Sequence, residues 1–390
     1  MDERTAGCVC IYRNTLLPWS ETFILEQARS LRRWRPLLAG RSRVAGGLDL
    51  AGLDVAVGAA GGWLPGAMLA RLPWLGIPPA VLTRAIAERR PRLVHAHFGR
   101  DAVSAAAIAR RLRLPLVTTI HGWELGQPID RRTPVHALHD RLVWRSMRAL
   151  FARPEASWIA VSAHVAAALA GLGAQRQRIH VLPIGVDLAR FAPTGADPIP
   201  GRILFVGRLV PIKGCDVLLR ALARLATTGR APAVHLRIAG DGPERAALTA
   251  LATQLGLTVT MLGRLDPAQV RAELAQADLL CVPSRVIGGL AEAFGIAFAE
   301  AQAMGVPVVS TATGGIPEAV ADGETGLLVP PDDPESLAGA IARLVCDRGL
   351  RATMSAAAVS RTARQHGLAA CTATLEDLYD RTAGEEAAWE

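Results

Sequence analysis

The sequence predicts an α/β protein built from two doubly wound parallel sheets. Short apolar runs rich in β-branched residues alternate with longer amphipathic stretches, and this alternation starts again in the second half of the chain. Such alternation is typical of parallel sheets that are covered by helices on both faces. The halves are separated by residues 191–201, which are dense in Pro and Gly. We therefore expect two Rossmann-like domains that face each other across a cleft and are joined by a linker at 191–200.

The first half predicts one domain over residues 1–190. Amphipathic spacing predicts helices at Glu21–Trp34, Asp101–Leu112 and Ala163–Ala170. Apolar runs predict strands at Gly7–Tyr12, Leu53–Val57, Leu93–His97, Leu116–Ile120, Trp158–Val161 and Ile179–Leu182. Ligands of such sheets bind where the strands end, so polar residues that directly follow strands are the candidates for function.

The second half predicts another domain over residues 201–365. The expected strands are Arg202–Val206, His235–Ala239, Val259–Leu262, Leu279–Val282, Pro307–Ser310 and Gly326–Val329. The expected helices are Asp216–Ala226, Glu244–Leu255, Ala268–Gln276, Ala297–Met304 and Glu335–Cys346. Asp266-Pro267 and Asp333-Pro334 each place a capping residue before a first-turn proline. The last segment, 366–390, is expected to be helical and to pack back on the first domain.

The composition fits a folded cytoplasmic protein. Hydrophobic residues make up 51% of the 390 residues and charged residues 20%, which argues against long disorder. The six cysteines lack zinc-binding spacing and no signal peptide is apparent, so we expect reduced, buried thiols. Every apolar run long enough to cross a bilayer is interrupted by Pro or Gly, so no membrane-spanning helix is predicted.

The charge is unevenly distributed along the chain. Residues 1–195 carry 26 basic and 13 acidic side chains, a net charge of +13, whereas residues 196–390 carry 17 and 22, a net charge of −5. The segment Val55–Thr83 contains a single charge, Arg71. A basic first half indicates an anionic partner. We expect this partner of the first domain to be either an anionic membrane surface, on the inner face of the plasma membrane, or an acidic molecule.

The loop Val206–Gly214 predicts an anion site. Of the 43 basic residues, 42 are Arg, and Lys213 is the one Lys. A retained Lys in a chain that otherwise uses Arg indicates a site that needs a compact ammonium group. Arg208 and Lys213 bracket a loop between a strand and a helix, an arrangement suited to a diphosphate. The alternative is two solvated cations on a surface loop.

Two carboxylates at Glu292 and Glu300 form a second candidate group. Glu292 lies in a Gly-rich loop, and Glu300 lies about five residues into the following helix, among small and apolar residues. A carboxylate in such surroundings is costly to bury unless it accepts hydrogen bonds, and the vicinal hydroxyls of a ribose would donate two. The alternative for Glu300 is an exposed position on the helix surface.

Histidines follow or end two strands of the first half. His121 directly follows the strand at Leu116–Ile120, where an imidazole can hydrogen-bond a substrate hydroxyl or carbonyl. His95 and His97 lie on one face of another strand, but no carboxylate cluster lies nearby in the sequence. We therefore predict no metal site.

Several motifs together resemble one enzyme family. Gly207-Arg208 with Lys213-Gly214, Gly240–Pro243, the Glu292 to Glu300 spacing and Gly314–Glu318 occur in order, and the set is similar to family 4 of the retaining glycosyltransferases, which have the GT-B fold. In the first half, Ser20–Ile24, Leu93–Gly99, His121–Glu124 and Leu182–Asp187 resemble bacterial members that build exopolysaccharide or other glycoconjugates. The chain departs from its relatives at Ile184, where Asn is frequent, and at Glu124, where Asp is common.

The resemblance implies a role for each matched residue. Arg208 and Lys213 would bind the donor diphosphate, Glu300 the ribose, and Glu292 the donor sugar, while His121 would contact that sugar from the opposing domain. Further donor contacts are implied at Gly207, Gly240, Asp241, Phe294, Gly295 and Ile296. Acceptor contacts are implied at Ser20, Glu21 and Thr22. The donor would be UDP- or GDP-linked, the acceptor lipid-linked or a small molecule, and no cofactor or metal is expected.

Two other functions remain open on the sequence. A sugar-nucleotide epimerase of the same fold would turn over the donor without an acceptor. A nucleic-acid-binding protein is suggested by a sequence pI of about 9.9, but it would interleave basic and aromatic residues. The Arg-rich stretches 29–43 and 84–92 contain only Trp34 among the aromatic residues, so we expect no nucleic-acid partner.

Overall fold

The computed structural model describes residues 7–58, 80–126, 134–228 and 232–384, apart from the side chains of Ser20, Trp123, Pro134, Val135, His136 and His139. The chain divides into two compact units. The first combines Met1–Gly185 with Leu368–Glu390, and the second is Val186–Gly367. The segment 191–200, expected as a linker, lies within the second unit in this division.

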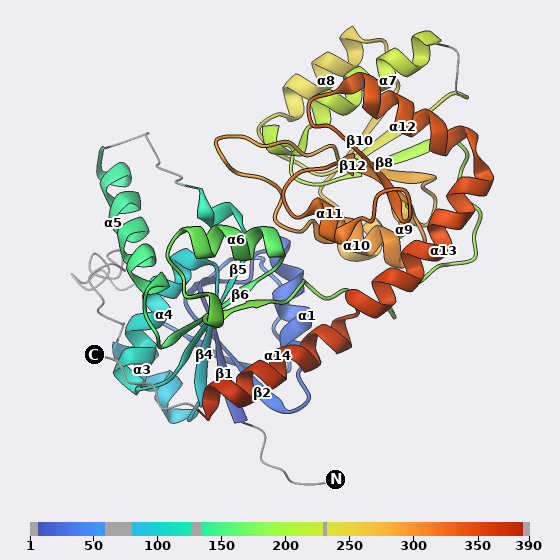
Figure 1. Cartoon of the computed structure of the whole chain (residues 1–390). Helices are drawn as coiled ribbons and strands as arrows, with labels where there is room; N and C mark the ends of the chain where they lie inside the picture. Colours follow the sequence, from blue (N-terminus) through green and yellow to red (C-terminus); the bar gives the residue numbers. More distant parts are fainter. Residues whose placement is uncertain (1–6, 59–79, 127–133, 229–231, 385–390) are drawn as a thin grey trace. The chain divides into compact units, whose positions relative to one another are not determined.

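The first unit is built on a seven-stranded parallel sheet with the order β3-β2-β1-β4-β5-β6-β7 (Figure 1). Its strands are β1 (Gly7–Leu16), β2 (Trp34–Arg43), β3 (Asp54–Val57), β4 (Leu93–His97), β5 (Leu116–Ile120), β6 (Ala156–Ala160) and β7 (Ile179–Val181). Its helices include α1 (Thr22–Ser30), α3 (Ala80–Glu88), α4 (Gly99–Leu112), α5 (Pro134–Phe151), α6 (Ala163–Gly171) and α14 (Leu368–Ala383).

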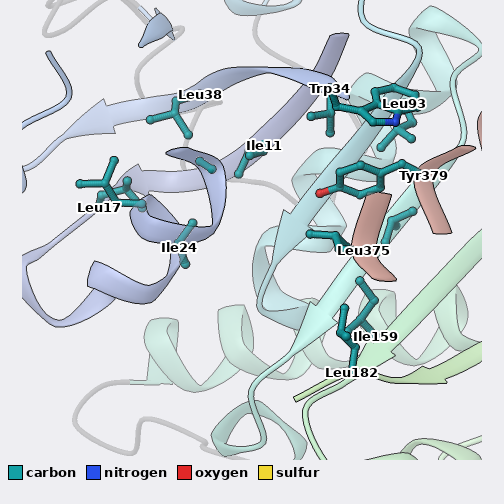
Figure 2. Packing of buried hydrophobic residues seen from close by; sticks show 14 of the residues in the cluster. Ile11, Leu17, Ile24, Trp34, Leu38, Leu93, Ile159, Leu182, Leu375 and Tyr379 are labelled. Carbon is teal, nitrogen blue, oxygen red and sulfur yellow. The ribbon is translucent and has the colours of Figure 1, made fainter. Parts of the chain in front are cut away.

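Both faces of this sheet are buried. Alternate residues of β1 point to opposite sides, so that Val9 and Ile11 join one apolar cluster, and Cys8, Cys10 and Tyr12 join the other. The C-terminal helix α14 closes the first cluster, as Figure 2 shows for Leu375 and Tyr379. Glu376 of the same helix accepts hydrogen bonds from the backbone amides that lead into β2, those of Arg32, Arg33 and Trp34. The end of the chain therefore completes the first unit.

The second unit repeats the architecture with a six-stranded parallel sheet of order β10-β9-β8-β11-β12-β13. Its strands are β8 (Arg202–Val206), β9 (His235–Ala239), β10 (Val259–Gly263), β11 (Leu279–Cys281), β12 (Val308–Thr311) and β13 (Gly326–Val329). Its helices include α7 (Cys215–Thr228), α8 (Arg245–Gln254), α9 (Pro267–Leu274), α10 (Ile296–Ala303), α11 (Ile316–Ala319), α12 (Pro334–Cys346) and α13 (Arg348–Gln365). Asp266 forms a capping box with Gln269 at the start of α9, and Asp333 caps α12.

Strand order reverses once in each sheet, between β1 and β4 in the first unit and between β8 and β11 in the second. The loops that leave the carboxyl ends of these neighbouring strands diverge to opposite faces, which opens a crevice where such sheets bind ligands. The sequence prediction of two doubly wound parallel sheets is thus confirmed, and the reversal points indicate where each unit can hold a ligand.

Some local predictions are wrong. The helix expected over Glu21–Trp34 ends at Ser30, and Trp34 begins β2, a strand that the sequence did not predict. Cys346 is exposed, whereas the other five cysteines are buried as expected. Most of the nearly uncharged segment Val55–Thr83 lies outside the described residues. Within the described ranges, no helix is both long and apolar enough to cross a membrane.

Candidate active site

An ion pair lies at the strand-order reversal of the second unit. Lys213 ends a short 3-10 helix (Pro211–Lys213) after β8, and its Nζ pairs with Oε2 of Glu292 in the loop between β11 and α10. The Oγ of Ser284 donates to the same carboxylate oxygen over 3.4 Å. The Lys213 and Glu292 side chains remain 23% and 14% exposed, so a ligand in solution can reach both.

Glycines let the loops around this pair pack closely. Gly214 has φ +65°, and a Cβ there would lie 2.0 Å from the carbonyl oxygen of Pro283. Gly314 has φ +57°, and a Cβ there would lie 2.2 Å from the carbonyl oxygen of Glu292. Any other residue at either position would push the loops apart. The Gly-rich turn after β12 therefore supports the backbone that carries Glu292.

Buried hydroxyl groups form further hydrogen bonds within the same loops. Thr311 and Thr313 both donate to the carbonyl oxygen of Ser284, the latter over 3.3 Å. Ser284 is fully buried and in turn reaches Glu292. Sequence reasoning missed Ser284, because one serine after a strand is a weak signal without its partners in space. Its position makes it a support for the carboxylate.

Arg208 differs from Lys213 in having no side-chain partner within the described part of the chain. Its side chain is exposed and forms no ion pair or side-chain hydrogen bond with any residue that the structure describes. The preceding Gly207 is fixed at the end of β8, where its amide donates to the carbonyl oxygen of Ala239 over 3.0 Å. The loop that leaves β8 thus carries both the paired ammonium of Lys213 and the guanidinium of Arg208, which has no partner among the described residues.

The turn after β9 completes this edge of the sheet. A Cβ on Gly240 would lie 1.8 Å from the carbonyl oxygen of Gly207, so the two turns touch through their backbones. Asp241 accepts from the amide of Gly242 over 2.8 Å, and its own carbonyl accepts from Leu209 over 2.9 Å. These predicted donor-site residues therefore brace the loop that carries Arg208.

Helix α10 begins beside the ion pair. Its N-cap is Gly295, with φ +80° and no side-chain cap, so first-turn amides such as that of Ile296 have no capping side chain. Phe294 is buried and packs edge-on against His366 with ring centroids 5.2 Å apart. Glu300 lies one turn into the helix and is half-buried. The predicted donor residues of this region are thus gathered around one helix N-terminus.

The first unit places His121 at the equivalent edge. Its backbone amide donates to Oε1 of Glu124 over 2.9 Å, and its ring lies against Phe98 and Phe23, with centroids 4.4 and 5.0 Å away. Its Nε2 lies 3.2 Å from Nδ1 of His97. Burial, followed by the charge of Arg13, lowers the pKa of His121 to about 3, so the ring is neutral at physiological pH.

Both ring nitrogens of His95 are hydrogen-bonded to other side chains of the protein. Its Nδ1 is bonded to the hydroxyl of Tyr379 over 2.5 Å and its Nε2 to that of Thr119 over 2.8 Å. Burial lowers its pKa to about 3. Among the residues that the structure describes, no group of three or more His, Cys, Asp or Glu is arranged to hold a metal ion.

The predicted acceptor residues lie in the turn between β1 and α1. Glu21 is buried, and both of its oxygens are bound by Arg13, which also pairs with Asp101. Thr22 begins α1, and the side chain of Ser20 lies outside the described residues. Sequence reasoning missed Arg13 and Asp101, because residues 88 positions apart give no local signal of their pairing.

Comparison with known proteins gives consistent family matches over residues 20–361. Residues 20–190 match the family model "Glycosyltransferase Family 4", and residues 190–361 match "Glycosyl transferases group 1". D-inositol 3-phosphate glycosyltransferase from Acidothermus cellulolyticus is 34% identical over 327 residues, which cover 74% of this chain and 67% of the relative. The enzyme of the same name from Frankia alni is 34% identical over 74% of this chain and 75% of the relative.

Solved structures show the same fold. Anabaena HepE in complex with UDP and glucose matches with a TM-score of 0.76 and 22% identity, over 95% of this chain and 99% of that one. Sucrose-phosphate synthase from Thermosynechococcus elongatus matches with a TM-score of 0.78 and 21% identity, over 96% and 98%. At these identities the likeness concerns the fold, and it confirms the predicted GT-B class.

Proposed function

Since this chain belongs to glycosyltransferase family 4, we propose that it is a retaining enzyme that transfers a sugar from a UDP- or GDP-linked donor to an acceptor without a metal ion. One observation carries the proposal. At the strand-order reversal of the second unit, one loop carries an exposed guanidinium that has no partner among the described residues and a reachable ammonium, and the ammonium pairs with Glu292, four residues before helix α10 begins. This is the chemistry that binds a diphosphate.

Arg208 and Lys213 would stabilise the departing diphosphate. Lys213 is held by Glu292, so its ammonium is already placed and would need little reordering when phosphate oxygens arrive. Arg208 has no acidic partner among the described residues, so its positive charge would be available to the phosphate. Fixed positive charge aimed at a developing anion is among the largest sources of catalytic rate.

The carboxylates would recognise the rest of the donor. Glu300 lies in the second turn of α10, and its two oxygens would accept hydrogen bonds from the ribose hydroxyls. Glu292 would meet the donor sugar, together with the backbone at Phe294, Gly295 and Ile296. The Thr311 and Thr313 hydroxyls hold the backbone of Ser284, and the Ser284 hydroxyl in turn donates to the carboxylate of Glu292, which stays 14% exposed.

The proposed reaction takes place on one face of the sugar. The bond from the anomeric carbon to the diphosphate oxygen breaks, and a bond to the acceptor oxygen forms on the same face. The departing phosphate oxygen takes the acceptor hydroxyl proton, so no protein base is needed. The positive charges of Arg208 and Lys213 would supply the stabilisation that a divalent metal provides in other enzymes.

The acceptor is proposed to bind the first unit, whose half of the chain carries the +13 charge. The names of the relatives, D-inositol 3-phosphate glycosyltransferases, favour a small acceptor that carries phosphate. In the turn between β1 and α1, Arg13 already occupies Glu21, whereas Trp19 is 60% exposed. An exposed indole at this edge can stack on an acceptor ring, so Trp19 joins Ser20, Glu21 and Thr22 as a proposed acceptor contact.

A peripheral membrane location on the cytoplasmic side is proposed for an enzyme with a lipid-linked acceptor. Helix α5 presents Arg141, Arg145 and Arg148 at spacings of four and three residues, all exposed, and Leu138 is 58% exposed one turn earlier. Each basic residue near an anionic leaflet contributes roughly 1 kcal/mol. Flotation with anionic and neutral vesicles at low salt tests this location. Failure to bind anionic vesicles would contradict it and favour a soluble acceptor.

The proposed reaction is tested by two measurements in sequence. Calorimetry with a panel of nucleoside-diphosphate sugars identifies the donor, and mass spectrometry of products from a library of phosphorylated and lipid-linked acceptors identifies the acceptor. Transfer that depends on the acceptor, with the anomeric configuration retained, supports the proposal. Donor turnover that continues without any acceptor would indicate an epimerase instead.

A further inference from the structure

Two histidines face each other at the carboxyl edge of the first unit's sheet. His97 ends β4 and His121 follows β5, with Nδ1 of His97 and Nε2 of His121 3.2 Å apart. The ring planes are 19° from parallel, and the ring centroids are 5.5 Å apart. The centroid distance exceeds the distance between the two nitrogens by about two imidazole ring radii, as expected when both nitrogens lie on the line between the centroids. The two nitrogens therefore point at each other, and the hydrogen bond is nearly linear.

The protonation of the two rings is coupled. Burial lowers the pKa of His121 to about 3 and that of His97 well below its usual value, so both rings are neutral. A neutral imidazole carries one N–H, and only one of the two facing nitrogens can be the donor. The choice on one ring therefore fixes which nitrogen carries the proton on the other.

The ring nitrogens that do not take part in the hydrogen bond between His97 and His121 indicate which ring is its donor. His97 Nε2 and His121 Nδ1 are both buried and have no hydrogen-bond partner among the described residues. His97 is 1% exposed, while His121 is less deeply buried. An orphaned buried N–H is rarer than an under-used acceptor. Each arrangement leaves one N–H unpaired, and the favoured one places it on His121, the less deeply buried of the two side chains, and leaves the bare nitrogen on His97.

We propose that His97 is a positioning residue, which donates from Nδ1 to Nε2 of His121 and so holds His121 in the tautomer that presents Nδ1–H to a substrate oxygen. This inference rests on the proposed function, in which His121 contacts the substrate. It assigns a role to the His95-Ala96-His97 strand end that is separate from metal binding. A donor at His121 suits the hydroxyl and phosphate oxygens of either substrate.

The backbone next to His97 supports this role. Phe98 has φ +70° and ψ 139°, which a residue with a side chain adopts only when its surroundings impose it. Its amide donates to the carbonyl oxygen of Thr119 over 2.8 Å. Its ring lies under Arg13, with Cζ 4.3 Å from the centroid, and beside His121. The strained backbone at Phe98 indicates that the surroundings hold this residue in place. Because its ring packs against His121, they also constrain the orientation of His121.

The test reads the tautomer directly in the full-length protein. Long-range ¹H–¹⁵N correlation spectra of ¹⁵N-histidine-labelled chain show which ring nitrogen of each histidine is protonated, and a His121→Asn variant assigns the signal. His97→Phe removes the donor, whereas His97→Asn keeps an amide donor near the position of Nδ1. His164→Asn, at an exposed position of α6, is the matched control. Circular dichroism confirms that each variant is folded.

We expect His121 to carry its proton on Nδ1 in the native protein and to lose this preference in His97→Phe. We also expect kcat to fall about 10–100-fold in His97→Phe, as for partners that orient other functional histidines, with partial rescue in His97→Asn. A folded His97→Phe protein with the native His121 tautomer, or a native His121 protonated on Nε2, would overturn the proposal. Full activity of His121→Asn would instead contradict the proposed function and leave the tautomer result standing.

Discussion

The two units place charged side chains at the same point of the same topology and use them differently. In the first unit, Arg13 bridges Glu21 and Asp101, and the three side chains are only 12%, 9% and 9% exposed. In the second unit, Lys213 is 23% exposed and Arg208 is exposed and unpaired among the described residues. The first cluster pairs its charges internally and holds the fold, while the second keeps positive charge for a ligand. Topology therefore indicates where a site can form, and pairing and exposure indicate which one binds an anion.

The largest expected effect comes from breaking the buried cluster of the first unit. Arg13→Met leaves Glu21 and Asp101 buried without a counter-charge, and we expect the free energy of unfolding of this unit to fall by about 3–5 kcal/mol. Urea unfolding followed by circular dichroism measures the change. Arg110→Met, at an exposed position of α4, is the matched control. Superimposable curves for Arg13→Met and the native chain would show that the cluster does not hold the fold.

The next effect separates charge for function from charge for stability. Lys213→Ala is expected to lower kcat by about 10²–10³-fold, because a fixed charge at the departing diphosphate is lost, while the fold survives. Lys213→Arg is expected to rescue poorly, since a planar guanidinium does not fit the place of the ammonium beside Glu292. Initial-rate assays measure both variants, with Arg220→Ala on the exposed face of α7 as control. An Arg variant with native activity would show that any cation serves.

A smaller effect is expected for the ribose contact. Glu300→Gln keeps the size of the side chain but removes its charge, and we expect nucleotide binding to weaken by about 1–3 kcal/mol through loss of charge-assisted hydrogen bonds. Calorimetric titration with the nucleoside diphosphate measures the change. Glu324→Gln, in an exposed turn, is the control. Equal affinities in all three proteins would return Glu300 to the role of a helix surface residue.

No effect is expected from removing divalent metal. Saturating EDTA should leave the initial rate unchanged, because the protein's own cations serve the diphosphate. The assay compares native enzyme with and without EDTA, and with added Mg²⁺ or Mn²⁺. A rate that vanishes with EDTA and returns with a metal would contradict the account and reopen the question of which residues bind that metal.

The sequence predicted the second unit better than the first, for a physical reason. The second unit's candidate residues directly follow strands and lie within loops rich in glycine, so local patterns reveal them. Strand β2 was missed because Pro36 and three exposed or half-exposed arginines surround a continuous buried run of only four residues, Leu37 to Gly40. A short apolar run of that kind has no period that distinguishes strand from helix.

The charged cluster of the first unit could not be predicted from local patterns at all. Arg13 and Asp101 become partners only because β1 and β4 are neighbours in the sheet. The same applies to the His97 and His121 pair, which neighbouring strands β4 and β5 bring together. Contacts between strand ends depend on strand order, which the sequence patterns did not provide.

Hydrogen–deuterium exchange of the full chain with and without nucleoside diphosphate tests the central claim most directly, because it reads both clusters in one experiment. We predict slower exchange in the second unit, over the loop 207–214 and over 284–297 at the start of α10. We predict no change around Asn14, Glu21 and Asp101 in the first unit. Protection confined to the first-unit cluster, or no protection at saturating nucleotide, would contradict the account.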